Sequence, residues 1–203
     1  MSRWSAIERT LRTAGHTRIA GMDEVGRGPL AGPVVVCALV MPAGERAIGG
    51  VRDSKQIGAT ERERLAVLIR ARAEAVGIGA ASVREIDRLN ILGATTLAMQ
   101  RALRRIAGRY DTLLVDGRPV RGLGVEHLAV VGGDDRCYAI ACASIVAKVV
   151  RDRLMARLAL RHPGYGWERN AGYGTAGHLA GLRGAGATPH HRPLFCRTAI
   201  GKE

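Results

Sequence analysis

Four acidic residues follow short apolar runs of the chain. Apolar runs of this kind predict buried strands, and the ends of buried strands lie at the rim of a sheet, where loops converge and sites form. Carboxylates gathered there repel one another unless a cation neutralises them. Hard divalent cations such as Mg²⁺ take oxygen ligands from carboxylates and substrate phosphates, and a pair of such ions hydrolyses phosphodiesters by in-line displacement. The four candidate ligands are Asp23, Glu24, Asp116 and Asp134.

Each of these acids also has an ordinary structural interpretation. Asp134 lies just before a predicted helix and is a suitable cap, and Asp116 with Gly117 is a common turn. Taken singly, each acid is more often structural than functional. The adjacent pair Asp23 and Glu24 is harder to explain by structure alone, because two acids at a strand end precede a Gly-Arg-Gly loop.

The overall charge favours a polyanionic partner. Lys and Arg number 31 against 18 acidic residues, the formal net charge is +13, and the sequence pI is about 10.9. Such an excess attracts nucleic acid, although an arginine-rich genome also produces it, and it says little about the fold. A basic surface that holds a phosphate backbone and acids that hold a metal together suit phosphodiester hydrolysis.

Cysteine usage and hydropathy indicate a cytoplasmic protein. The four cysteines form no C-x-x-C motif and no zinc-finger spacing, so we interpret them as reduced packing residues. The N-terminal segment lacks the apolar core of a signal peptide, and no apolar run is long enough to span a bilayer. We expect a protein that makes no membrane contact and acts as a monomer.

A loose glycine pattern follows the first predicted strand at Gly26, Gly28 and Gly32. A dinucleotide-binding fold would need a helix next, but Pro33 and a strand-like run follow, so that fold is excluded. The pattern instead predicts a loop whose bare backbone approaches a nucleic acid strand, with Arg27 available to a phosphate. The chain has no G-x-x-x-x-G-K-[ST] motif, which argues against a nucleotide triphosphatase.

Strands and helices alternate along the chain, which predicts a mixed α/β sheet flanked by helices. Thr60 with Glu63 resembles a capping box, Gly77 is expected to end the helix behind it, and Asn90 is expected to cap the next helix. The glycine-rich segment after Pro163 predicts a small C-terminal cap. The expected strands are 18–25, 33–41, 78–83, 112–115 and 129–131, and the longest expected helix is 137–160.

The order of several motifs resembles the type 2 ribonucleases H, the ribonuclease HII family. Eighteen positions separate Asp116 from Asp134, which is similar to the bacterial branch. The motifs that carry the resemblance cover nearly the whole chain: MDEVGRGPLAGPVVVCALV at 22–40, RDSKQI at 52–57, LNILGATTLAMQRAL at 89–103, VDG at 115–117, GGD at 132–134, ASIVAKVVRDRLM at 143–155, PGYG at 163–166 and AGYGTAGH at 171–178.

The resemblance implies a ribonuclease-H-like catalytic domain over 1–160 and a helical cap over 161–203. It implies that Asp23, Glu24, Asp116 and Asp134 hold two Mg²⁺ or Mn²⁺ ions. The implied activity is endonucleolytic hydrolysis of the RNA strand of RNA–DNA hybrids. It includes nicking on the 5′ side of a ribonucleotide embedded in duplex DNA, which leaves a 3′-hydroxyl and a 5′-phosphate and serves ribonucleotide excision repair.

The resemblance also assigns residues to the substrate. The loop Gly26-Arg27-Gly28 is expected to read the ribose 2′-hydroxyl, and Tyr173 to stack on the next deoxyribose. A packed core aromatic is the structural alternative for Tyr173. The family positions near the phosphate backbone are Ser54, Lys55, Ser144 and Lys148.

Several neighbouring residues are expected to be structural. Lys148 and Asp152 have the spacing of a helical ion pair, so Asp152 is not counted as a fifth ligand. An oxygen-rich Mg²⁺ site needs no histidine, so we expect His178, His190 and His191 to be surface or packing residues.

Two positions depart from the family pattern. Ala171 stands where a lysine usually precedes Gly-Tyr-Gly, which removes a phosphate contact, and Leu194 replaces a serine of the tail. Two alternatives remain. A ribonuclease HIII would carry a further N-terminal domain, for which the 17 residues before the first predicted strand leave no room. A non-catalytic nucleic-acid-binding module would bind in a salt-sensitive way without metal-dependent cleavage.

Overall fold

The structure is a computed structural model that describes residues 5–43 and 45–200. These residues form a five-stranded sheet in the order β3-β2-β1-β4-β5. The hairpin and the β2–β3 pair are antiparallel, whereas β4 lies parallel to both β1 and β5, so the predicted mixed sheet is confirmed. The strands are β1 Ile19–Val25, β2 Val34–Val40, β3 Ala75–Ala81, β4 Thr112–Asp116 and β5 Leu128–Val130.

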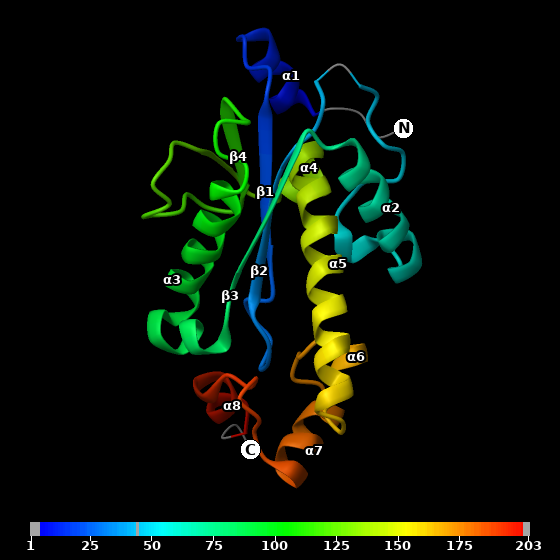
Figure 1. Ribbon diagram of the computed structural model, residues 1–203, viewed down its shortest axis with the longest axis vertical. Coiled ribbons are helices and arrows are strands. Elements are labelled where there is room, and N and C mark those ends of the chain that lie inside the picture. The colour runs from blue at the N-terminus through cyan, green and yellow to red at the C-terminus, as the bar shows by residue number, and fades with distance from the viewer. Residues whose placement is uncertain (1–4, 44, 201–203) are drawn as a thin grey trace.

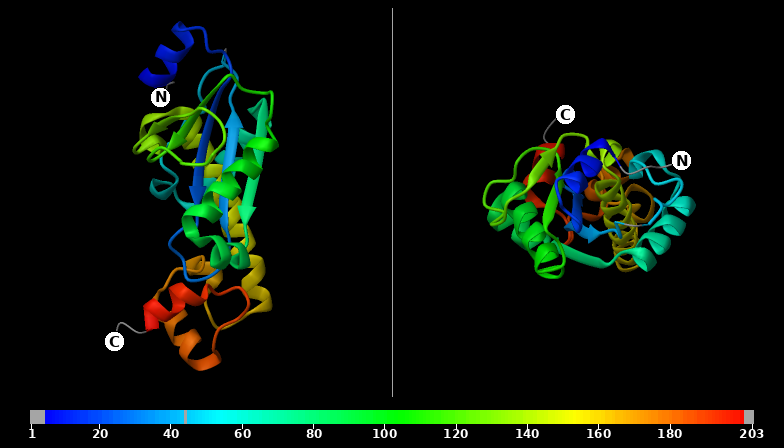
Figure 2. Two further views of the ribbon diagram at one scale, coloured as in Figure 1. Left: turned by 90° about the vertical axis from the view of Figure 1, so that its left-hand side faces the viewer. Right: turned by 90° about the horizontal axis from the view of Figure 1, so that it is seen from above.

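Helices cover both faces of this sheet (Figure 1). Helix α3 packs on β2 and β3 from one face, and α5, backed by α2, packs on β1 and β2 from the other (Figure 2). No described helix is long and apolar enough to cross a membrane. The helices are α1 Ala6–Thr13, the short 3₁₀ helix η1 Ser54–Gln56, α2 Ala59–Arg72, α3 Val83–Arg104, α4 Gly133–Arg136, α5 Tyr138–Arg161, α6 Trp167–Asn170, α7 Ala176–Ala185 and α8 Pro193–Ile200.

The chain after α5 folds into short helices at one end of the molecule (Figure 1). Trp167 and Tyr165 form an apolar cluster there with Leu30, from the loop after β1, and with Met155 of α5. This small helical part therefore shares its core with the larger part. The predicted boundary at 160 stays a prediction.

Apolar side chains of the strands point alternately to the two faces of the sheet, so an apolar core lies on each face. On one side Ala20 and Met22 pack with Leu113 and Val115 beneath α3. On the other, Ile19 and Leu114 pack with Ile140 of α5. Successive side chains of a strand point to opposite faces. Asp23 and Asp116 therefore extend the face that α5 covers.

Helix α5 lies unusually close to β1 because Gly21 has no side chain. A Cβ at this position would lie 2.2 Å from the carbonyl carbon of Ala139. The N-terminus of α5 is held by Glu8 of α1, a fully buried residue whose carboxylate accepts from the N–H of Tyr138 at 3.1 Å and of Ala139 at 2.8 Å. These contacts fix α5 against β1 two residues before Asp23.

Two local sequence predictions are wrong. Helix α2 begins at Ala59 with Gly58 as its cap, so Thr60 already lies inside the first turn and forms no capping box. Gly77 does not end a helix; α2 ends at Arg72, and Gly77 lies within β3, which also begins before the predicted residue 78. Its missing side chain admits α3, because a Cβ there would lie 2.2 Å from the carbonyl oxygen of Ala102.

The prediction for Asn90 is confirmed, although a further helical segment precedes it. Asn90 has φ 56° and interrupts α3, and its side chain accepts from the N–H groups of Leu92 and Gly93 at 2.9 and 3.1 Å. The segment before it is capped by Ser82 with Glu85 in a capping box. The cysteines agree with their interpretation as packing residues, since all four are free and buried.

Candidate active site

The register of β1 and β4 brings two acids side by side. Met22 pairs with Val115 across these parallel strands, so Asp23 and Asp116 occupy the next positions on the same face. Asp116 accepts a hydrogen bond from the N–H of Gly133 at 2.7 Å, which holds the turn after β5 against the end of β4. The sequence expectation that acids at strand ends converge is met for this pair.

Burial and mutual repulsion raise the pKa of the neighbouring carboxyls. Asp23 is buried, and desolvation, then Glu24, then Asp116, raise its pKa well above the ordinary value, with a hydrogen bond from Ser144 opposing them. Burial also raises the pKa of Glu24, while the guanidinium of Arg27 at 3.3 Å opposes that shift. Two adjacent carboxyls that resist ionisation are where a cation would be most stabilising.

Asp134 lies in α4, one residue after the Gly133 that binds Asp116. Its pKa is raised by burial and then by the charge of Asp116. The Nζ of Lys55 lies 3.6 Å from its carboxylate. Asp134 is thus electrostatically coupled to Asp116 and is paired with Lys55, which the family resemblance had assigned to the substrate.

A groove of about 680 Å³ opens over these acids. Most predicted substrate residues line it, whereas Asp134 and the loop 26–28 do not. The predicted residues along the groove are Asp23, Glu24, Ser54, Lys55, Asp116, Ser144, Lys148 and Tyr173.

The donor set fits a hard divalent cation. Among residues 5–43 and 45–200, no three Asp, Glu, His or Cys side chains converge as a complete ligand set. Mg²⁺ does not require one, because it keeps several waters and binds through one or two carboxylates and substrate phosphates. Burial, and after it the charge of neighbouring carboxylates, raises the pKa of Asp23 and of Glu24, and a bound cation would oppose both causes.

The predicted serines and lysines have partners within the protein. Ser54 and Ser144 are buried and hydrogen-bonded to each other at 2.8 Å, and Ser144 also forms a hydrogen bond with Asp23. Lys148 pairs with Asp152 at 2.7 Å, as their spacing predicted. Asp152 lines the same groove but is neutralised by this lysine.

Tyr173 is not a packed core aromatic. It is 45% exposed and faces the groove. A Cβ added at Gly28 would lie 3.9 Å from the Cε1 of Tyr173, so the loop after β1 and the tyrosine ring are neighbours across the entrance. Two of the three histidines act as packing residues, since His178 and His191 are buried beside Trp167, whereas His190 is half-buried.

Sequence reasoning missed several arginines of this region. Arg151 and Arg192 are fully buried beneath the loop 26–33, and among the described residues every hydrogen bond that they donate goes to a backbone carbonyl. Helical spacing carried a signal for Arg151, since it lies on the apolar face of α5 between Ala147 and Met155. Three further arginines line the groove: Arg62, Arg153 and Arg169.

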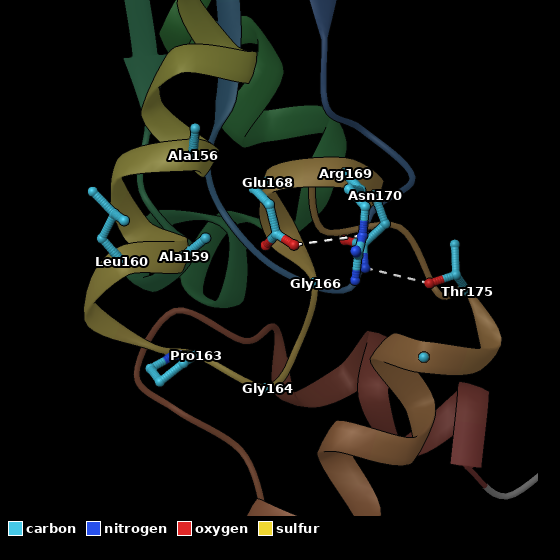
Figure 3. A pocket seen from close by; sticks show the side chains of 11 residues that line it. Ala156, Ala159, Leu160, Pro163, Gly164, Gly166, Glu168, Arg169, Asn170 and Thr175 are labelled. Carbon is cyan, nitrogen blue, oxygen red and sulfur yellow. Dashed lines mark hydrogen bonds and ion pairs between the residues drawn. The ribbon is translucent and has the colours of Figure 1, made fainter.

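A second hollow of about 810 Å³ lies between the end of α5 and helices α6 and α7 (Figure 3). Its walls include Ala159, Leu160 and Pro163. Its acid, Glu168, pairs with Arg169 at 3.5 Å. Because it is apolar and has no carboxylate cluster, we assign hydrolytic chemistry to the groove with Asp23.

Neither of the two departures from the family pattern falls on one of the four candidate acids. Ala171 adopts a left-handed conformation with φ 48°, and its carbonyl accepts from Arg151 at 2.8 Å. Leu194 is 60% exposed at the start of α8, while Phe195 and Cys196 next to it pack inward. The tail therefore stays packed without the serine.

Comparison with solved structures defines the class of the fold. The structure is similar to the ribonuclease H2 of Pyrococcus horikoshii, with a TM-score of 0.72 at 24% identity over 91% of this chain and 98% of that chain. It is also similar to Bst-RNase HIII in complex with Mn²⁺, with a TM-score of 0.67 at 19% identity over 96% of this chain and 72% of that chain. The fold is therefore that of the ribonucleases H, as predicted.

Sequence comparison defines the family. The chain is 52% identical over 190 residues to ribonuclease HII of Thermosynechococcus vestitus, covering 93% of this chain and 88% of that protein. It is 55% identical over 190 residues to ribonuclease HII of Rhodospirillum rubrum, covering 92% and 87%. The ribonuclease HII family model matches residues 20–198, and the chain belongs to this family. It is a metal-dependent endonuclease that hydrolyses the RNA of RNA–DNA hybrids.

Proposed function

We propose that this ribonuclease HII nicks duplexes on the 5′ side of a ribonucleotide, including a single ribonucleotide embedded in DNA. The observation that carries the proposal is the pair Asp23 and Asp116, brought together by the register of β1 and β4 in a groove that five lysines and arginines also line. With Glu24 and Asp134, these acids would hold two Mg²⁺ or Mn²⁺ ions. Such ions would supply an activated water and stabilisation of the leaving oxygen, and the products would be a 3′-hydroxyl and a 5′-phosphate.

The protein's own groups hold and orient the substrate. Lys55 and Lys148 line the groove beside the acids and can contact phosphates flanking the cleaved bond. Arg169, which lies two residues before Ala171, is exposed along the same groove and offers a cation where the usual lysine is lacking. These positions support binding of a phosphate backbone across the acids.

We propose that the ribonucleotide is recognised at the entrance of the groove, between Gly28 and Tyr173. The 2′-hydroxyl alone distinguishes RNA from DNA at a given position, so a reader must lie close to the sugar. The exposed glycine backbone at 28 allows such an approach, and the exposed Tyr173 ring offers a surface for the next deoxyribose. The non-catalytic binding module is set aside, because the relatives are ribonucleases.

We further propose that the enzyme acts in the cytoplasm as a monomer and serves ribonucleotide excision repair. Its four free, buried cysteines support a reducing compartment. An archaeal relative of the fold has been solved as a PCNA:RNase HII complex, from Archaeoglobus fulgidus. Light scattering of the purified chain tests the monomer.

A nicking assay tests the proposed activity. The substrate is a labelled DNA duplex with one ribonucleotide, incubated with Mg²⁺, with Mn²⁺ or with chelator, beside an all-DNA duplex. We expect metal-dependent cleavage on the 5′ side of the ribonucleotide and an intact control. Cleavage of both duplexes would contradict the assignment of a 2′-hydroxyl reader, and absence of cleavage with either metal would contradict the metal site.

A further inference from the structure

Two arginines are buried where an apolar residue would be less costly. Arg151 is 0% exposed and Arg192 is 1% exposed. Within residues 5–43 and 45–200 neither guanidinium forms an ion pair, and Asp152, whose charge reaches Arg151, pairs with Lys148 instead. A buried charge without a counter-ion is expensive unless hydrogen bonds compensate it. The bonds that these arginines make therefore indicate why they are there.

Arg192 bonds to the loop that the proposed function assigns to the ribose. Its guanidinium donates to the carbonyl of Gly26 at 2.6 Å, of Arg27 at 2.8 Å, and of Gly32 at 2.8 and 3.0 Å. One planar side chain thus holds both ends of the turn.

Arg151 supports the same loop from α5. It donates to the carbonyls of Pro33 at 3.0 Å, Ala31 at 3.1 Å and Ala171 at 2.8 Å. Gly26, with φ 91°, rests directly on it, since a Cβ there would lie 2.1 Å from the Nε of Arg151. Only glycine fits this backbone conformation and this contact.

The orientation of the loop's amide groups follows from these bonds. The described chain has no cis peptide, and in a trans peptide the C=O and the following N–H point in opposite directions. Because the carbonyls of Gly26 and Arg27 point inward to Arg192, the N–H groups of Arg27 and Gly28 point outward. Residues 27 and 28 are exposed, and no hydrogen bond to either N–H is found among the residues described.

We propose that Arg192, supported by Arg151, is a positioning residue for ribose selection: it orients two peptide groups so that the N–H groups of Arg27 and Gly28 face the ribose. This inference rests on the proposed function, in which the loop reads the 2′-hydroxyl. In this inference the backbone N–H groups of Arg27 and Gly28 bind the 2′-hydroxyl. Arg192 orients them and does not itself contact the substrate. The side chain of Arg27 is left for a phosphate.

The test compares affinities for two duplexes of one sequence, one with a single ribonucleotide and one all DNA. All variants carry Asp116→Asn, so that binding is measured without cleavage. Arg192→Lys keeps a buried cation but cannot hold two carbonyls in one plane. Arg192→Met removes the charge at similar volume, and Arg197→Met, at an exposed arginine of α8, is the matched control. Thermal unfolding checks that each variant folds.

We expect the parent to prefer the ribonucleotide duplex. Arg192→Lys should reduce this preference by about tenfold or more, because misaligned donors no longer match a single hydroxyl. All-DNA affinity, which phosphate contacts set, should stay within about twofold. Arg197→Met should keep the parent's preference, and Arg192→Met should lose it if it folds.

An unchanged preference in folded Arg192→Lys overturns the inference, and so does an equal loss of affinity for both duplexes. A parent that shows no preference is a different result. It rejects 2′-hydroxyl reading by the loop, and with it the proposed function on which this inference rests.

Discussion

The backbone N–H of Gly133 donates to the Asp116 carboxylate at 2.7 Å, and this bond joins the end of β4 to the short helix α4 that carries Asp134. A second bond, from the N–H of Gly117 to the carbonyl of Val130 at 2.9 Å, joins the same two strands just beyond their pairing. Strand β5 pairs with β4 over only three residues. The bond to Asp116 therefore matters for where Asp134 lies, and one carboxylate serves the geometry and the charge of the site.

Asp116→Asn should separate these two roles. The amide oxygen can still accept from Gly133, so the fold should persist, but the negative charge is lost. We expect cleavage to fall by at least about 100-fold, since even the outer partners of metal ligands contribute 10–100-fold. The nicking assay measures the rate, and thermal unfolding checks the fold.

Asp111→Asn is the matched control, because Asp111 directly precedes the first residue of the same strand. Asp111 accepts from the N–H groups of Thr17 and Arg18, each at 3.0 Å. Replacing this charged acceptor by a neutral amide should lower the free energy of unfolding by about 1 kcal/mol and leave the cleavage rate unchanged. Turnover like that of the wild type in Asp116→Asn would reject the assignment of Asp116.

Asp23→Asn should stabilise the protein while inactivating it. Burial and the neighbouring acids raise the pKa of Asp23, so the folded state binds its proton more readily than the unfolded chain. The free energy of unfolding therefore falls as pH rises from the ordinary carboxyl pKa through the raised one, because ionisation of the buried Asp23 opposes folding. A neutral isostere removes this cost, which we expect to raise stability by about 1–2 kcal/mol, or a few degrees in Tm.

Thermal unfolding of Asp23→Asn with chelator and with Mn²⁺ measures both effects. The wild type should gain stability when the metal binds, and Asp23→Asn should gain much less. Asp152→Asn is the control, because it changes an acid of the same groove but removes the ion pair with Lys148. With chelator its Tm should not rise above that of the wild type, and Mn²⁺ should raise its Tm as much as it raises that of the wild type. A full metal response in Asp23→Asn would remove Asp23 from the site.

The sheet and its acids could be predicted because each depends on a local pattern. The apolar runs that end at Asp23 and Asp116 are strands, and parallel register brings them together. The buried arginines could not be predicted, because Arg192 meets Gly26 across 166 positions of sequence and nothing near it marks it as buried. The error at Gly77 has a similar origin: only the approach of Ala102, from a later helix, explains that glycine.

Arg27→Ala should weaken binding more than it harms the fold. The side chain is 48% exposed and makes one ion pair, with Glu24 at 3.3 Å, and an exposed pair of this kind contributes no more than about 1 kcal/mol. Removing it should also raise the pKa of Glu24 further, since Arg27 opposes that shift. Affinity for an RNA–DNA hybrid, measured at two salt concentrations, should fall with a shallower salt dependence. Unchanged affinity would leave Arg27 without a role in binding.

Gly21→Ala should disrupt the packing of α5 on β1. The new Cβ would lie 2.2 Å from backbone atoms of Ala139, which cannot move aside as a flexible side chain could. We expect a loss of about 3 kcal/mol or more, at the upper end of the cost of overpacking, together with reduced cleavage because Asp23 lies two residues further on. Gly49→Ala is the control, since no atom lies within 4 Å of its Cβ position. Denaturant unfolding of both variants measures the difference, and equal stabilities would contradict the close packing at Gly21.

The buried histidine pair should make stability depend on pH. The N–H of Thr188 donates to the Nδ1 of His191 at 2.8 Å, so neutral His191 carries its proton on Nε2, from which it donates to the Nε2 of His178 at 3.0 Å. That His178 nitrogen also accepts from Trp167 at 3.0 Å, so protonating either histidine breaks the network. Burial, followed by the charge of His178, lowers the pKa of His191 to about 4.

The unfolded chain, with an ordinary histidine pKa of about 6.5, therefore binds more protons than the folded protein between about pH 6.5 and pH 4. The stability that neutral His191 contributes is fully present above that window and is lost as pH falls through it. At about 1.4 kcal/mol per pKa unit, the loss approaches about 3 kcal/mol. Denaturant unfolding at pH 7.5 and pH 5 should show a smaller decrease for His191→Gln than for the wild type, because carboxyls that titrate in this range are common to both. Parallel pH profiles would show that this pair does not control acid stability.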